Sequence, residues 1–325
     1  MHTEVLAADQ LSITRAIECL RTGKTVALPT ETVYGLAADA VNPEAVASIF
    51  AVKERPRFDP LIVHLPATDW LDRVARVPEA DKGLVEQLID RFWPGPLTLV
   101  LPRQSIVPDI VTAGLETVAV RMSAHPVFAQ IVRTFGGPVA APSANRFGRL
   151  SPTTAQHVME ELHGRIPLII DGGPTRLGIE STIVSLKDNG ISILRKGPIS
   201  AEELKEIALV NTITTMDVIS APGQLPSHYA PRTPLRLVPD SGSFSPSPEQ
   251  RVGLLAWSRA QPFTKFAAVR LLSPTQDLKE AAAHLFRFLR ELDALELDLI
   301  VAEQLPEEGL GAAIMDRLQR AAAKL

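Results

Sequence analysis

Apolar and polar residues alternate between helical and strand-like patterns along most of the chain. Residues 9–22 repeat apolar side chains at helical spacing, and the short apolar run at 25–28 ends at a proline. A second helix is predicted from Asn42 to Lys53, because Asn42 can cap the first turn and Pro43 suits the first helical position. Such an alternation of helices and strands predicts an α/β fold.

Further apolar runs in the same region have the length and composition of buried strands. They cover residues 61–65, 97–101, 117–122, 167–171, 181–186 and 191–195. In the run 117–122, strand alternation puts three apolar residues on one face and Thr117 and Arg121 on the other. A helix is predicted to start at Ser151-Pro152, and Ser200 with Glu203 predicts a capping box for a later helix.

A proline-rich segment separates this region from a second one. Residues 209–234 include four prolines within thirteen positions, which removes too many N–H donors for regular structure. The sequence therefore predicts a domain at 1–208, an extended linker at 209–234 and a small parallel α/β domain at 235–325. In this last domain strands are predicted at 235–238, 252–257, 267–272 and 298–302, and helices at 278–292 and 311–323.

Composition narrows the class of protein. The 325 residues suit two domains, since about 150 residues per domain is common. With 33 basic and 37 acidic residues the net charge is -4, which argues against coating nucleic acid through bulk charge. The only cysteine, Cys19, excludes an intramolecular disulfide and lies on an apolar helical pattern that predicts a buried thiol. Without an apolar run of about 18 residues or a leader pattern, a soluble cytoplasmic protein with no membrane contact is expected.

Two polar segments of the first region are candidates for ligand binding. The segment PTETVYGL at 29–36 brings hydroxyl groups to the end of a predicted strand, although an ordinary loop would look the same. The segment 53–64 places Lys53, Arg55 and Arg57 within five residues. Such cations repel one another unless they share an anion such as a triphosphate, and the alternative is a solvated run of charge.

A third segment, residues 142–153, carries Ser143, Asn145 and Ser151. These side chains, a glycine and the predicted helix start suit a nucleotide, because the start of a helix offers free N–H groups. Turn and cap chemistry would explain the same residues.

A fourth segment, residues 171–182, adds the hydroxyl of Ser181, and Arg195 follows on a later strand. His64 lies on an apolar strand, where it is either a ligand-binding group or a core histidine. The sequence contains none of the common phosphate-loop, dinucleotide, serine-elbow or zinc-helix motifs. A bound nucleotide would therefore need a different cradle.

Taken together, these motifs resemble one family. PTETVYGL, KxRP followed by PLIVH, TxAxR, PSANxxG with SPT, DGG and ESTIV resemble the YrdC-like domain of L-threonylcarbamoyladenylate synthases. The segments SHYAPR at 227–232 and GLGAAIMDRL at 309–318 resemble the long, two-domain form of the family. The resemblance implies a YrdC-like mixed twisted sheet with flanking helices, followed by a small Rossmann-like parallel α/β domain.

The resemblance also implies a reaction. L-Threonine, bicarbonate and ATP would give threonylcarbamoyl-AMP and pyrophosphate, and a downstream threonylcarbamoyl transferase would pass the group to an adenosine of tRNA. Mg²⁺ would accompany ATP, and no tightly held protein metal site is expected. A weak direct contact with tRNA is compatible with this scheme.

The same resemblance implies the site residues. Threonine is expected to meet Thr32, His64, Arg121, Ala141 and Ser181. ATP is expected to meet Lys53, Arg55, Asp59, Thr117, Ser143, Asn145, Ser151, Arg195 and Tyr229. Lys53 and Arg55 would also neutralise charge during the reaction. Independently of the resemblance, the proline-rich linker has few internal hydrogen bonds and must find partners elsewhere, so it is expected to fold over the site as a lid that carries Tyr229.

The resemblance leaves the roles of Asp59 and of the pair Asp316 and Arg317 open. Asp59 stands where members of the family commonly have asparagine, and a carboxylate beside phosphates is repulsive unless a metal or Arg57 shares it. Asp316 and Arg317 in the tail are expected to affect the stability of the second domain and catalysis only indirectly.

Two other functions compete with the synthase. One is a non-catalytic module that binds double-stranded RNA or tRNA, because Lys53, Arg55, Arg57, Arg146 and Arg149 could line one basic concave face. The other is a carbamoyl transferase of the hydrogenase-maturation type. Such proteins resemble this chain only over the first region and carry cysteine-rich zinc segments, which a single cysteine excludes.

Overall fold

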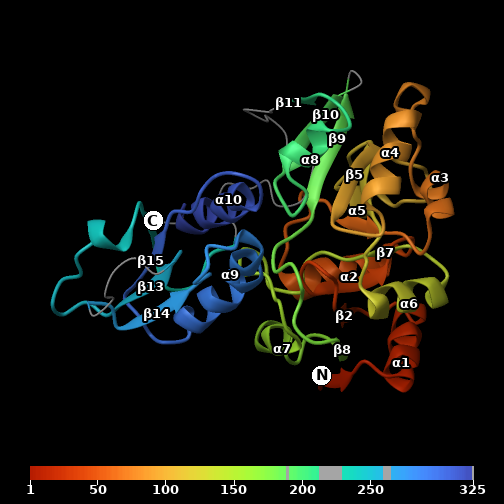
Figure 1. Cartoon of the computed structure of the whole chain (residues 1–325). Coiled ribbons are helices and arrows are strands. Elements are labelled where there is room, and N and C mark those ends of the chain that lie inside the picture. The colour runs from red at the N-terminus through yellow and green to blue at the C-terminus, as the bar shows by residue number, and fades with distance from the viewer. Residues whose placement is uncertain (188–189, 212–228, 259–264, 324–325) are drawn as a thin grey trace.

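Two separate sheets organise the molecule, in a computed structural model that describes residues 1–187, 190–211, 229–258 and 265–323. One sheet has eleven strands and the other has four. Figure 1 shows the larger sheet and its helices as one body and the four-stranded sheet beside it. We refer to residues 1–211 as the N-terminal body and to 229–323 as the C-terminal body. Most of the predicted linker lies outside the described residues.

The large sheet is mixed, as predicted. Its strands are β1 (Glu4–Ala7), β2 (Val26–Leu28), β3 (Gly35–Asp39), β4 (Ile62–His64), β5 (Leu97–Pro102), β6 (Thr117–Arg121), β7 (Val139–Ala140), β8 (Leu168–Asp171), β9 (Thr182–Lys187), β10 (Gly190–Arg195) and β11 (Val210–Asn211). Their order is β1-β8-β2-β3-β7-β4-β6-β5-β9-β10-β11. Strands β4 and β6 pair in parallel, whereas β5 and β6 pair antiparallel. The six strand runs predicted between residues 61 and 195 agree with the observed strands to within one residue at each end.

Helices cover this sheet. They are α1 (Gln10–Arg21), α2 (Pro43–Lys53), α3 (Leu71–Val74), α4 (Lys82–Phe92), α5 (Asp109–Thr112), α6 (Pro126–Phe135), α7 (Ala155–Leu162) and α8 (Ala201–Lys205), with short 3₁₀ turns at Thr68–Trp70 and Glu79–Asp81. The Asn42 side chain accepts hydrogen bonds from the first turn of α2, and Ser200 forms the predicted capping box with Glu203. Glu54 follows helix α2 as its C-cap in a left-handed conformation, and the next residue, Arg55, lines the cavity described below.

The predicted helix start at Ser151-Pro152 is wrong. Helix α7 begins at Ala155, and the side chain of Thr154 caps it by accepting from the backbone N–H of His157. The Ser151 hydroxyl instead donates to Glu180, so it takes no part in capping. The predicted burial of Cys19 is also only partly correct, because this residue is half-buried.

The C-terminal body is the predicted small parallel α/β unit. Its strands are β12 (Leu235–Val238), β13 (Val252–Ala256), β14 (Ala268–Leu271) and β15 (Leu299–Glu303), in the order β12-β15-β13-β14, and all three pairings are parallel. A 3₁₀ turn covers Ser241–Ser243, and the helices are α9 (Leu278–Asp293) and α10 (Leu310–Ala322). Across the described residues, no helix combines the length and the apolar character needed to cross a membrane.

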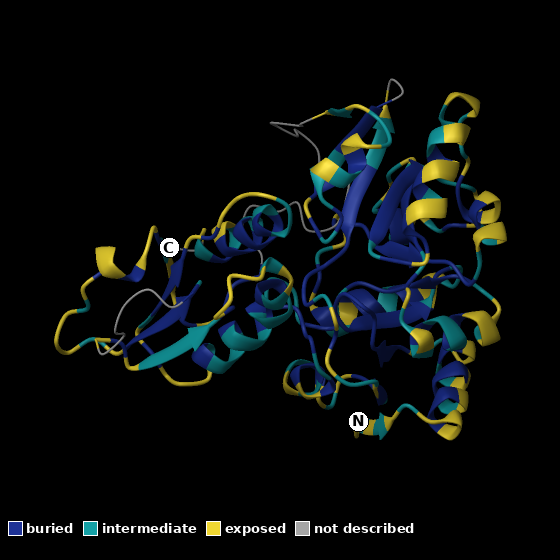
Figure 2. Ribbon diagram, in the orientation of Figure 1, coloured by how far each residue is buried: buried dark blue, intermediate teal, exposed yellow. Residues whose placement is uncertain are grey.

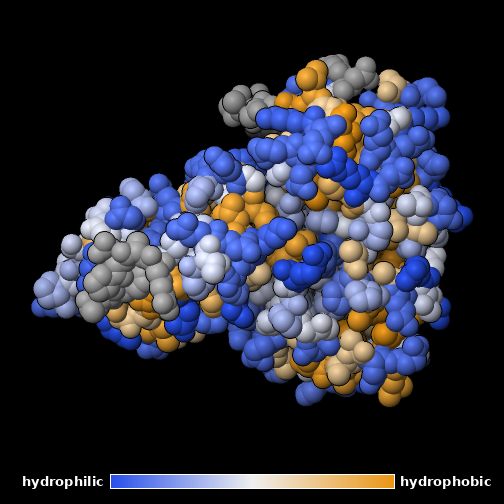
Figure 3. Space-filling view, viewed as in Figure 1, coloured by the Kyte–Doolittle hydropathy of each residue, from blue (hydrophilic) through white to orange (hydrophobic). Residues whose placement is uncertain are grey.

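The two bodies share a buried apolar cluster. Figure 2 shows the helices α9 and α10 buried where they face the N-terminal body, and hydrophobic residues also gather there on the face shown in Figure 3. The cluster joins Leu285 and Phe286 of α9 to Leu150, Ile179 and Tyr229. The C-terminal body therefore packs against the other body through a continuous core.

Gly178 allows helix α9 to pack closely against the backbone of the N-terminal body. It has a φ of +72°, and a Cβ at this position would lie 2.3 Å from the carbonyl oxygen of Ala282. Further along α9, Arg290 donates to the carbonyl oxygen of Leu150 and lies 3.3 Å from a carboxylate oxygen of Glu161. Only glycine combines the left-handed conformation with this contact.

We expect Gly178→Ala to lower the free energy of unfolding by about 2 to 4 kcal/mol, because backbone strain adds to overpacking against α9. Gly173→Ala is the matched control, since Gly173 has a φ of +81° but a Cβ added there would meet no atom within 4 Å. The control should cost about 1 kcal/mol. Urea denaturation of both variants measures the difference, and equal losses would contradict the packing role of Gly178.

Candidate active site

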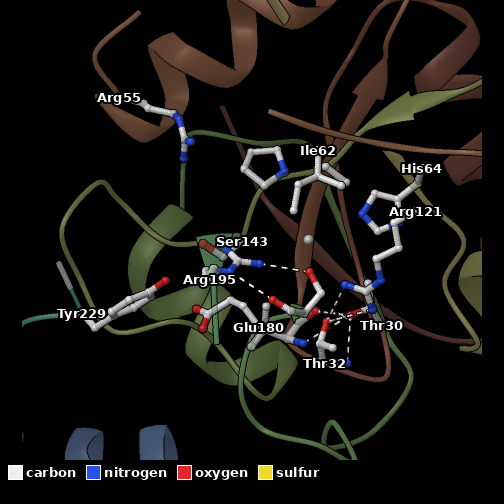
Figure 4. A pocket seen from close by; sticks show the side chains of 15 residues that line it. Thr30, Thr32, Arg55, Ile62, His64, Arg121, Ser143, Glu180, Arg195 and Tyr229 are labelled. Atoms are coloured by element: carbon white, nitrogen blue, oxygen red, sulfur yellow. Dashed lines mark hydrogen bonds between the residues drawn. The ribbon is translucent and has the colours of Figure 1, made fainter. Parts of the chain in front are cut away.

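A cavity opens at the ends of several strands of the large sheet (Figure 4). Strands β4 and β6 run in parallel with His64 opposite Arg121, so both side chains belong to the same edge. Ser181 lies directly before β9, and Arg195 ends β10. Nine of the predicted site residues line the cavity: Thr32, Arg55, His64, Arg121, Ala141, Ser143, Ser181, Arg195 and Tyr229.

Arg121 is held by a buried network at one end of the cavity. Its Nη2 lies 2.6 Å from Glu31 Oε1, both of its terminal nitrogens donate to Thr32 Oγ1 at 3.2 Å, and Nε donates to the carbonyl oxygen of Gly95. Ser123 donates to the other oxygen of Glu31. Burial alone would raise the pKa of Glu31, but Arg121 and these hydrogen bonds outweigh it and bring the pKa to about 2. The pair therefore stays ionised and rigid.

His64 lies beside Arg121 and is almost fully buried. Burial, and then the positive charge of Arg121, lower the pKa of His64 to about 3. The ring is therefore neutral near pH 7, and its centroid lies 4.8 Å from that of Phe128. Nδ1 has no hydrogen-bond partner among the described residues, which leaves a buried polar atom able to meet a ligand.

Ser181 and Arg195 form the adjoining wall. Arg195 donates through Nε to the carbonyl oxygen of Ser181 and through Nη2 to its hydroxyl oxygen at 3.0 Å. The same hydroxyl lies 2.8 Å from Thr98 Oγ1. Burial lowers the pKa of Arg195, but an arginine stays protonated near pH 7, so this wall carries a positive charge.

Arg55 is the third arginine that lines the cavity, and Asp59 is its partner. Arg55 Nη2 lies 2.8 Å from Asp59 Oδ2, and both side chains are buried. The partner of Asp59 is therefore Arg55 and not the exposed Arg57 that the sequence suggested. Burial raises the pKa of Asp59 even though Arg55 and Lys53 oppose the shift.

Four of the predicted site residues lie behind the cavity wall. The Lys53 ammonium donates to the carbonyl oxygens of Ser143 and Asn145, and burial lowers its pKa well below the usual range. Asn145 donates to the carbonyl oxygens of Arg146 and Arg149, and Ser151 donates to Glu180. Lys53, Ser151 and Asp59 thus hold residues that line the cavity, namely Ser143, Glu180 and Arg55, whereas the Asn145 side chain fixes its own loop.

Thr117 is the one predicted residue that the fold places apart. It begins β6, whereas Arg121 ends it, so the two lie about 13 Å apart along the strand. Thr117 does not line the cavity.

Glu31, Ser123 and Glu180 are part of the site but were not predicted. Glu31 and Glu180 belong to motifs that were noticed for their threonines and serines. A buried arginine requires a carboxylate nearby, and this rule was the only signal that could have pointed to them. The sequence alone could not match each acid to its base.

Arg317 is a further residue whose place was not predicted. It comes from α10 of the C-terminal body, yet its Nε lies 2.9 Å from Glu180 Oε2 at the cavity. Arg317 therefore contacts the N-terminal body as well as its own domain, and the expectation that Asp316 and Arg317 affect catalysis only indirectly stays a prediction.

The basic face required by an RNA-binding module is not formed. The side chains of Lys53 and Arg55 are buried, with 1% and 8% of each residue exposed. Arg146 is partly buried against Glu161. The five cations therefore do not share one exposed surface.

Two family models match the chain in tandem. The model described as Telomere recombination, of the Sua5/YrdC type, matches residues 18–197, and the model of the threonylcarbamoyl-AMP synthase C-terminal domain matches residues 199–323. The fold and the cavity thus define a protein of the Sua5/YrdC class with a second domain attached.

Relatives match over nearly the whole length. A threonylcarbamoyl-AMP synthase of Pyrococcus abyssi is 38% identical over 96% of this chain and 94% of its own, and one of Bacillus subtilis is 40% identical over 98% and 95%. The crystal structure of P. abyssi Sua5 complexed with L-threonine covers 99% of this chain and 98% of its own, with a TM-score of 0.88 and 36% identity. The chain therefore belongs to the threonylcarbamoyl-AMP synthase family, in its two-domain form, and is an enzyme.

The buried His64 gives a pH-dependent stability that can be measured. Because its pKa is about 3 in the folded protein and roughly 6.5 when unfolded, the unfolded chain binds one proton more between these values. The free energy of unfolding should therefore decrease as the pH is lowered through this window. His64 contributes up to about 1.4 kcal/mol of this decrease per pH unit.

The variant His64→Gln removes this contribution. Urea denaturation between pH 6.5 and 4.5 should give a shallower loss of stability in the variant than in the wild type. Parallel curves for the two proteins would show that His64 is not held neutral.

Proposed function

We propose that this chain joins L-threonine, bicarbonate and ATP to form threonylcarbamoyl-AMP and pyrophosphate. The observation that carries the proposal is one cavity with two different ends. A rigid guanidinium, Arg121, lies beside neutral His64 at one end, and the cations Arg55 and Arg195 lie with Tyr229 toward the other. A small amino acid and a polyphosphate would each find suitable partners there.

The Arg121 end suits the amino acid. Glu31, Thr32 and Gly95 accept from most of the five N–H donors of Arg121, and an Nη1 donor remains to meet a carboxylate. Thr32, His64 and Ser181 supply polar groups, and Ala141 leaves room for a small side chain. The related P. abyssi protein was crystallised as a complex with L-threonine, which supports this assignment.

The other end suits the nucleotide. Arg55 and Arg195 would meet the triphosphate, with Ser143 and Tyr229 beside them, while Lys53, Asn145 and Ser151 keep the wall in place. Asp59 and Thr117, also expected near ATP, do not line the cavity, and Asp59 would act through Arg55.

In the proposed reaction a carbamate oxygen attacks the α-phosphorus of ATP and the bond to pyrophosphate breaks. The carbamate itself forms when the threonine amine and bicarbonate combine with loss of water. Positioning and neutralisation of charge carry such a transfer, so no covalent protein nucleophile is needed.

Mg²⁺ belongs to the proposal as part of the substrate MgATP. Within the described ranges no three His, Cys, Asp or Glu side chains gather in a group suited to a metal. Phosphate oxygens and water would therefore provide most of the magnesium ligands, as is common for this ion.

The product fits a cytoplasmic role in tRNA modification. The product is a mixed anhydride, which is easily hydrolysed, so a downstream threonylcarbamoyl transferase would have to take it up. Any contact between this chain and tRNA would be weak.

We further propose domains at 1–208 and 235–325, with the linker 209–234 acting as a lid. In support, Tyr229 at the described end of the linker is buried against the cavity.

Pyrophosphate release should require both L-threonine and bicarbonate, because the attacking carbamate does not exist without them. A coupled assay with each substrate omitted in turn measures this dependence. Serine should be a poorer substrate, since one missing methyl group costs about 1 to 3 kcal/mol of discrimination. Equal release of pyrophosphate without threonine would contradict the proposal.

Arg121→Lys should weaken threonine binding more than tenfold while the protein stays folded. Lysine keeps a positive charge against Glu31 but loses the planar set of donors. Arg103→Lys is the matched control, because Arg103 forms ion pairs with Asp109 and Glu116 near the surface. Calorimetry measures the affinity of each variant for L-threonine. An unchanged affinity in Arg121→Lys would show that Arg121 does not bind threonine.

A further inference from the structure

A buried arginine of the C-terminal body reaches the wall of the cavity. Only 1% of the Arg317 side chain is exposed. Its Nε lies 2.9 Å from Glu180 Oε2, and its Nη2 donates to the carbonyl oxygen of Lys196 at 3.0 Å. Both acceptors belong to the N-terminal body. Asp316 beside it accepts from Nη1 at 2.6 Å, so the guanidinium is fixed from three sides.

Glu180 connects this arginine to the ligand space. It lines the cavity, and its other carboxylate oxygen accepts a hydrogen bond from Ser151. Burial disfavours the charge of Glu180, but Arg317 and then Arg195 outweigh this effect and lower its pKa. The carboxylate is therefore ionised and oriented by one residue from each body.

Tyr229 is held by the same arginine. The Arg317 guanidinium carbon lies 5.0 Å from the centroid of the Tyr229 ring, within the range of a cation–π contact. Phe286 of α9 packs against the ring at a centroid distance of 5.6 Å. Figure 4 shows Tyr229, Glu180 and Arg195 on the same side of the cavity, away from Thr32 and Arg121.

Charge explains why this contact matters. A carboxylate at the edge of a cavity that takes a polyphosphate would repel it, and the repulsion is strong where water is excluded. Arg317 offsets the charge of Glu180 from behind, which reduces the repulsion between this carboxylate and a polyphosphate held by Arg55 and Arg195.

We propose that Arg317 is a positioning residue of the active site, which holds Glu180 and Tyr229 in the arrangement that binds the nucleotide. The C-terminal body thereby completes the nucleotide half of the cavity, while the threonine half depends on the N-terminal body alone. The inference rests on the proposed function, because it takes ATP as the ligand.

The test compares Arg317→Met, Arg317→Lys, Glu180→Gln and the double variant Glu180→Gln/Arg317→Met in the full chain. Arg270→Met is the matched control, because Arg270 pairs with Glu291 inside the C-terminal body. Calorimetry measures the affinities for ATP and for L-threonine separately, and thermal denaturation reports folding.

Arg317→Met should weaken ATP binding at least tenfold and change threonine affinity less than twofold. Arg317→Lys should lie between Arg317→Met and the wild type. The double variant should bind ATP better than Arg317→Met, because it no longer contains an uncompensated buried carboxylate. The control should leave both affinities unchanged.

The inference is overturned if folded Arg317→Met or Arg317→Lys binds ATP as the wild type does, or if both ligands weaken equally. Should Arg317→Met fail to fold, Arg317→Lys decides by the same ATP and threonine measurements. A wild-type protein that binds neither ligand would instead contradict the proposed function, so the two failures are distinguishable.

Discussion

The structure depends on how its buried positive charges are neutralised. A cavity that binds anions needs arginines, yet an arginine removed from water needs hydrogen-bond acceptors, and a buried counter-charge stabilises it further. Three arginines at the cavity each face a buried carboxylate at 2.6 to 2.9 Å, in the pairs Arg121–Glu31, Arg55–Asp59 and Arg317–Glu180. These pairs allow the cavity to be lined by charged groups that are held in fixed positions.

The same constraint explains an unusual residue. A carboxylate at Asp59 looks unfavourable beside phosphates, but its charge is balanced by Arg55 at 2.8 Å, and Lys53 lies close enough to oppose its protonation. Arg55 is also fixed by the carbonyl oxygen of Pro60 at 2.8 Å. Asp59 therefore orients the Arg55 guanidinium that lines the cavity, although its negative charge also reduces the attraction that Arg55 exerts on an anion.

Local signals in the sequence predicted the elements well, and long-range pairing could not be predicted. The capping residue Asn42 and the apolar run at 117–122 define their helix and strand through neighbours a few positions away. Arg121 and Glu31 are 90 positions apart, and Arg317 and Glu180 are 137 apart. The sequence shows that such arginines need acids, but only the fold decides which acid each one meets.

Ser151 illustrates the same limit in one side chain, because a hydroxyl before a helix can either cap it or donate elsewhere, and here Glu180 competes successfully for it. The other oxygen of Glu180 accepts from Arg317 of the C-terminal body, so one carboxylate meets a residue from each body. The buried Arg317–Glu180 ion pair at 2.9 Å requires the two bodies to be packed firmly together. If only the connecting chain joined them, small displacements would admit water and weaken the pair. The close contact of α9 at Gly178 and the shared apolar cluster supply the necessary rigidity, so the packing of the two bodies and the shape of the cavity are one structural problem.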